Sequence, residues 1–109
     1  MAYDETLARR VRAVLGDLPT LTEKKMFGGV GYLINGNMAC GVHREFLIVR
    51  IGPDHYQEAL EKQHTEVFDI TGRAMTGWVM VAPQGCAEDE ALRAWIQQGL
   101  GFVSTLPAK

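Results

Sequence analysis

The sequence has few cysteines, no long hydrophobic run and little excess charge, and each shortage excludes something. Its two cysteines, Cys40 and Cys86, are too few for a disulfide framework, so we expect two free thiols. No apolar run approaches the roughly 20 residues that span a bilayer. The N-terminal segment, 1–14, also lacks the apolar centre of a signal peptide. We therefore expect a cytoplasmic protein without membrane segments.

Excess positive charge is also missing. The formal net charge is −2 and the isoelectric point is about 5.9, whereas a domain held to nucleic acid by phosphate contacts is normally basic. This slightly negative net charge disfavours direct nucleic-acid binding. One alternative stays open, because Arg9, Arg10 and Arg12 with Lys24 and Lys25 would form a basic patch if the fold brought them together.

Metal-binding and catalytic motifs are absent. The potential metal ligands are Cys40, His43, His55, His64 and Cys86, but they form neither a Cys-x-x-Cys nor a His-Glu-x-x-His pattern. Cys40 and His43 are three residues apart in an expected strand, which sends their side chains to opposite faces. We therefore expect no metal and no cofactor.

Neither cysteine is placed as a nucleophile. Cys40 lies in an apolar strand, where burial raises the pKa of a thiol. We expect Cys86 to be exposed in a loop, just before the acidic run 88–90, whose carboxylates disfavour a thiolate. No paired carboxylates with a catalytic spacing are apparent either, so the sequence leans away from an enzyme.

What is present is a globular composition in one domain, residues 1–109. With 47% hydrophobic and 22% charged residues, the chain can bury a core without disulfides. Apolar spacing and turn residues predict the order helix, three strands, helix, two strands, helix. The first helix follows Asp4, has its apolar stripe at Leu7, Val11, Val14 and Leu18, and is ended by Gly16 and Pro19. The expected strands are 32–34, 37–40, 45–51, 67–70 and 78–81, the second helix is 53–60, and the last helix begins in the acidic run 88–90 and ends at 106–109. Mostly antiparallel strands with segregated helices indicate a two-layer α+β fold.

The glycine-rich segment 26–42 is the most informative part of the chain. Gly28-Gly29-Val30-Gly31 lacks the Gly-Lys-Ser/Thr of a phosphate-binding loop, and a hairpin follows it where a dinucleotide site would start a helix. Asn35-Gly36 favours a type I′ hairpin turn. The glycines are best interpreted as backbone devices for a bend, a bulge or a close approach. Because Lys24 and Lys25 precede them, an anion site remains an alternative.

These residues carry a resemblance to a known family. Met26-Phe27-Gly28-Gly29, then Gly31-Tyr32, the Asn-Gly hairpin and the strands 47–50 and 78–81 together resemble the N-terminal domain of the TfoX (Sxy) family of bacterial competence regulators. The resemblance covers nearly the whole chain. It implies a curved antiparallel sheet with helices on one side, like the secretion-chaperone-like group, and no established catalytic residues. Full-length members carry a second, helical domain that we do not expect here.

Two functions follow as expectations. The first is a non-enzymatic regulatory or adaptor domain in transcriptional or competence control, working through a protein partner or as a homodimer. The second is a small-ligand sensor or an unrecognised enzyme, in which aromatic and arginine side chains converge on a pocket. Its tentative ligand-binding residues are Phe27, Gly28, Gly29, Tyr32, Arg50, Arg73 and Trp78.

Overall fold

The computed structural model describes residues 3–26, 28–69 and 75–108. In that part of the chain, helices and strands follow in the order α1 (Glu5–Leu15), β1 (Leu21–Met26), β2 (Gly29–Ile34), β3 (Asn37–His43), β4 (Phe46–Arg50), η1 (Pro53–His55), α2 (Tyr56–Leu60), β5 (Thr65–Val67), β6 (Trp78–Val81), η2 (Pro83–Gly85) and α3 (Asp89–Val103). The predicted α+β class is confirmed.

The strands form a curved, open, antiparallel sheet in the order β1-β2-β3-β4-β6-β5. The first four strands are a meander in which each strand pairs with its neighbour in sequence, and β6 then pairs with β4. The sequence predicted three strands before the second helix, whereas the structure has four. The additional strand, β1, pairs along its whole length with β2 and forms one edge of the sheet.

The sheet has two chemically different faces. A cross-strand row that contains Tyr32, Cys40, Val49 and Val79 belongs to the hydrophobic core, and we call this side the core face. The neighbouring row joins Gly31, Gly41, Ile48 and Met80, and its side chains point the opposite way, because alternate residues of a strand face opposite sides. We call that side the outer face.

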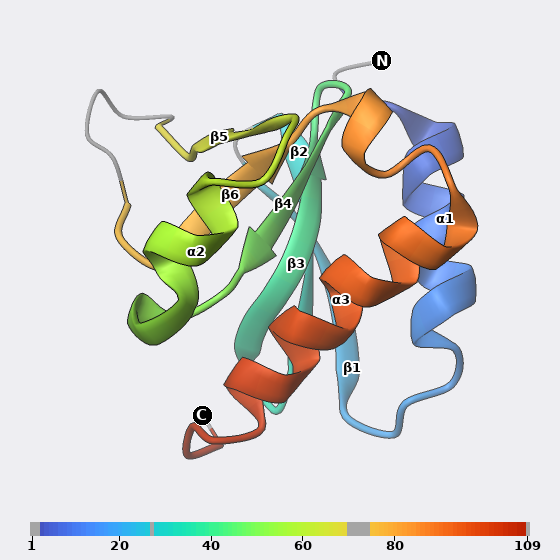
Figure 1. Cartoon of the computed structure of the whole chain (residues 1–109). Coiled ribbons are helices and arrows are strands. Elements are labelled where there is room, and N and C mark those ends of the chain that lie inside the picture. The colour runs from blue at the N-terminus through green and yellow to red at the C-terminus, as the bar shows by residue number, and fades with distance from the viewer. Residues whose placement is uncertain (1–2, 27, 70–74, 109) are drawn as a thin grey trace.

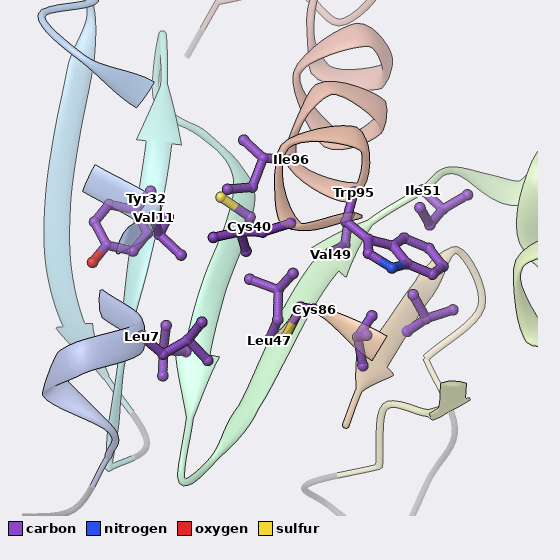
Figure 2. Close-up of a cluster of buried hydrophobic side chains, with 14 of the residues drawn as sticks. Leu7, Val11, Tyr32, Cys40, Leu47, Val49, Ile51, Cys86, Trp95 and Ile96 are labelled. Carbon is purple, nitrogen blue, oxygen red and sulfur yellow. The ribbon is translucent and has the colours of Figure 1, made fainter. Parts of the chain in front are cut away.

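All the helices lie over the core face. Their buried residues and those of the core face form a single hydrophobic cluster, part of which is drawn in Figure 2. Its members from outside the sheet include Leu7, Ala8, Val11, Leu15, Tyr56, Ala59, Cys86, Leu92, Trp95 and Ile96. Figure 1 shows α3 crossing the middle of the sheet between α1 and α2. Among the residues that the structure describes, no helix covers the outer face.

A cap and a contact with α3 hold α1 in place. Asp4 caps α1, since its Oδ1 accepts a hydrogen bond from the backbone N–H of Leu7 at 3.0 Å. Arg10 Nη2 then donates to the carbonyl of Ala87 at 2.9 Å and to Oδ1 of Asp89 at 3.2 Å. The hydrogen bond between Arg10 and Asp89 connects α1 to the start of α3, 79 residues further along the chain.

Candidate functional site

Arg50 and Trp78 form the centre of a cluster of one arginine and several aromatic side chains. They are directly opposed across β4 and β6, and the Arg50 Cζ lies 5.3 Å from the centroid of the Trp78 ring. The same guanidinium lies 5.4 Å from the ring of Phe102 in α3. Because Arg50 is the last residue of β4, its side chain reaches a ring in the sheet and a ring in a helix at once.

The cluster includes a third aromatic, Phe68, which directly follows β5. The rings of Phe68 and Trp78 lie 6.0 Å apart at an interplanar angle of 36°, within the range of favourable aromatic contacts. Phe68 is buried, whereas Arg50, Trp78 and Phe102 are partly exposed. The cluster is therefore a packed platform with one accessible side, and cation–π contacts hold its guanidinium in place.

The other predicted site residues lie elsewhere. Tyr32 is fully buried on the core face, and its hydroxyl donates to the carbonyl of Ala8 in α1 at 3.2 Å. Burial raises the pKa of Tyr32 to about 12, against the opposing hydrogen bond with Arg12. Figure 2 shows its ring beside Val11 of α1. Tyr32 is thus part of the core, away from Arg50 and Trp78.

Gly28 and Gly29 belong to the hairpin between β1 and β2. Gly28 lies in a turn with φ +74°, and Gly29 pairs with Met26 on one side and His43 on the other. A Cβ at Gly29 would overlap the carbonyl oxygen of Val42, so a close approach of strands needs glycine there. Since His43 pairs with Phe46, these glycines lie beyond the first residue of β4, while Arg50 is its last. Phe27 and Arg73 lie outside the described residues.

A cleft adjoins the Arg50 cluster through Phe102. It has a volume of about 460 Å³ and lies between η1–α2 and the C-terminal half of α3, lined by Ile51, Gly52, Asp54, His55, Glu58, Gln98, Gly101, Phe102 and Thr105. Sequence reasoning missed Phe102 and the cleft, because their partners are about 50 positions apart. One signal was available: Asp54 and Glu58 are four residues apart, on the side of the helix away from the buried Tyr56 and Ala59.

Both thiols are held in their neutral form. Burial raises the pKa of Cys40 to about 12, and burial is also the main cause of the raised pKa of Cys86. The expectation that Cys86 is exposed was wrong. It is 1% exposed, because η2 turns its side chain into the core cluster, where its thiol lies 3.7 Å from the carbonyl of Ala82.

Neither a group of metal ligands nor a membrane-spanning helix is found in the part of the chain that the structure describes. Over the ranges 3–26, 28–69 and 75–108, no three His, Cys, Asp or Glu side chains are grouped as metal ligands. None of the helices in these ranges is long and apolar enough to cross a membrane. His43 has a buried Nδ1 with no hydrogen-bond partner in the same ranges, and in the sheet it lies between Gly29 of β2 and Phe46 of β4.

The fold and its surface together define a small α+β domain with an open antiparallel sheet that is covered by helices on one face. Comparison with known families agrees with this description: the TfoX N-terminal domain matches residues 13–103. The match spans well over half of the chain, so the chain belongs to the TfoX N-terminal domain family, as its glycine segment and strand pattern predicted. No protein with a curated description matches it significantly.

Proposed function

We propose that the chain is a non-enzymatic regulatory or adaptor domain that acts through protein contacts, in transcriptional or competence control. Family membership supports the regulatory class. The observation that carries the proposal is the outer face of the sheet, which no helix of the described residues covers. Its apolar side chains are Leu33, Met38, Phe46, Ile48, Trp78 and Met80.

The outer face is suited to a partner by its chemistry. Ile48 is almost fully buried, while Phe46 and Met80 beside it are partly exposed. Covering the partly exposed apolar side chains of this face is favourable, because burying apolar area contributes roughly 25 cal/mol per Å². The edge strand β1 is a poorer docking element, since its exposed Lys24 and Lys25 oppose strand addition. We propose a second copy of this chain or a partner protein on the outer face.

Light scattering at high protein concentration tests the proposal. We expect an assembly larger than one chain, or a specific complex with a protein captured from the native extract. Phe46→Lys is expected to abolish the assembly or the complex, while the circular dichroism spectrum stays unchanged. Leu18→Lys is the matched control, because Leu18 is 37% exposed in the loop after α1, away from the sheet face. A strict monomer that captures no partner would contradict the proposal.

A second candidate function is the sensing of a small ligand beside Arg50. Its support is the cluster itself: Arg50 contacts two aromatic rings and makes no salt bridge within the described residues. The adjoining cleft has a size typical of ligand sites. A thermal-shift screen of nucleotides, acyl thioesters, sugar phosphates and amines separates this candidate from an adaptor that responds to protein alone.

A further inference from the structure

The cleft between η1–α2 and α3 has walls of two kinds. Its apolar side consists of the buried Ile51 and the ring of Phe102, with Gly52 packed against that ring. A Cβ on Gly52 would overlap the Phe102 ring, so the absence of a side chain keeps this wall flat. A flat apolar wall suits a methylene chain or a small ring, because such surfaces bind by excluding water.

The polar side of the cleft is rich in hydrogen-bond acceptors. Asp54 and Glu58 are exposed and four residues apart, so both carboxylates lie on the same side of the η1–α2 segment. Across from them, α3 contributes Gln98, whose side-chain amide has a carbonyl oxygen that can accept a hydrogen bond. Thr105 donates its hydroxyl to the carbonyl of Phe102 at 2.6 Å, which leaves its oxygen able to accept.

No lysine or arginine of the described residues pairs with these carboxylates. The lining contains neither lysine nor arginine, and its one basic side chain is His55, next to Asp54 in η1. The salt bridges of the described residues, which count histidine as a cation, involve neither Asp54 nor Glu58. The cations on flanking segments are used elsewhere: Arg50 on Trp78 and Phe102, and Lys62 on the ring of Trp95 at 5.0 Å. A ligand that brings its own positive charge and several donors therefore matches the cleft.

We propose that this cleft binds a primary aliphatic amine, with the ammonium group between Asp54 and Glu58 and the methylene chain along Phe102. An ammonium group has three donors and no acceptor, which complements carboxylates and the carbonyl of Gln98. The proposal deepens the second candidate function, since it names the ligand class for the site beside Arg50. A free diamine and a lysine side chain of a partner protein share this chemistry.

Titrations followed by ¹H–¹⁵N NMR test the chemistry with probes of matched length. 1,5-Diaminopentane is expected to shift amide signals of Glu58, Gln98 and Phe102. Glutarate and 1,5-pentanediol have the same number of carbons but no positive charge. Neither is expected to shift these signals. Nα-acetyl-lysine N-methylamide tells the two sources apart: binding as tight as that of the diamine favours a lysine side chain, and much weaker binding favours a free diamine.

Two variants locate the binding site. Glu58→Gln is expected to lower the affinity for 1,5-diaminopentane on the order of fivefold, as for a single partly exposed ion pair, and Glu45→Gln in the β3–β4 turn is the control with the same charge change. Gly101→Leu adds a side chain where nothing lies within 4 Å, so it fills the cleft mouth without disturbing the core. We expect it to abolish the shifts.

Each result decides between the proposals. Diamine shifts at the cleft that both variants weaken would establish an amine site. Binding of glutarate in preference to the diamine, or diamine shifts that neither variant changes, would overturn the amine inference and leave a sensor of another ligand class. No shift with any probe at millimolar concentration would overturn the inference too. Because Gly101→Leu leaves the outer face intact, light scattering of this variant reports on the adaptor proposal separately.

Discussion

Gly99 of α3 lies so close to β3 that a Cβ on it would sit 2.5 Å from the carbonyl oxygen of Ala39. This approach seats the long helix in the middle of the core face. Two residues later, Gly101 faces the cleft, and a Cβ there would meet nothing within 4 Å. The same helix thus contains one glycine required by packing and another that packing does not require.

Alanine substitutions at these two glycines are expected to have opposite effects on stability. Gly99→Ala forces α3 away from β3 and should lower the free energy of unfolding by about 1–3 kcal/mol, as overpacked cores do. Gly101→Ala should raise it by about 0.5–1 kcal/mol, because alanine loses less conformational entropy in a helix. Urea unfolding measures both. Equal effects at the two positions would show that α3 is not seated as described.

Substitutions of Arg50 and Phe102 are expected to have coupled effects on the free energy of unfolding. Arg50→Ala and Phe102→Leu should each destabilise the protein, and the double variant should lose less than the sum by about 0.5–1 kcal/mol, the usual size of a partly exposed cation–π contact. Arg93, exposed on α3, supplies the control pair with Phe102. Strict additivity of Arg50→Ala and Phe102→Leu would mean that the guanidinium does not stack on the α3 ring in solution.

Stability is expected to fall as the solution becomes alkaline. Burial raises the pKa of Cys40 and of Tyr32 to about 12, above the ordinary values of 9.0 and 10.0 that apply to the unfolded chain. A raised folded-state pKa contributes stability below the unfolded value, and this contribution is lost as the pH rises through the folded value. The urea midpoint should therefore be constant to about pH 9 and decline above it.

Substitutions show whether Cys40 and Tyr32 cause the decline of the urea midpoint at alkaline pH. Cys40→Ala and Tyr32→Phe each remove one titrating group, so each should flatten the dependence of the urea midpoint on pH, whatever its effect at neutral pH. Lysine and surface tyrosine titration affects wild type and variants alike and cancels in the comparison. An unchanged slope in both variants would count against the burial of these side chains.

The thiols are expected to be inert in the folded protein. Cys40 and Cys86 are buried, and both have raised pKa values, so neither offers an accessible thiolate. Ellman's reagent should give almost no rapid reaction in buffer and should detect both thiols in denaturing urea. Cys86→Ala distinguishes the two. Rapid reaction of native wild type that this variant loses would place Cys86 in the exposed loop that the sequence suggested.

Much of the fold is readable from apolar spacing. Asp4, Gly16 and the stripe through α1 predicted that helix closely, and β6 was predicted at its observed bounds, 78–81. The strand β1 escaped prediction because Thr22, Glu23, Lys24 and Lys25 are all exposed, so an edge strand shows no apolar alternation. Its residues are held by backbone pairing with β2, which leaves no mark on side-chain type.

The candidate site was less readable. Of the residues grouped from the sequence, Arg50 and Trp78 lie together, since the last residue of β4 pairs with the first residue of β6. Tyr32 was grouped with them because an aromatic in a glycine-rich segment looks available for binding, whereas strand alternation and α1 place it in the core. Phe102 and the cleft depend on where α3 crosses the sheet, and one-dimensional spacing contains no information about a crossing.

The order of the strands has a consequence for synthesis of the chain. The four strands of the meander are complete by Arg50, and each pairs with a neighbour in sequence, so they can assemble while translation continues. The helix that seals their core face, α3, begins at Asp89. A nascent chain therefore exposes the apolar core face of its sheet until α3 emerges, and this interval is when misassembly or chaperone capture is most favoured.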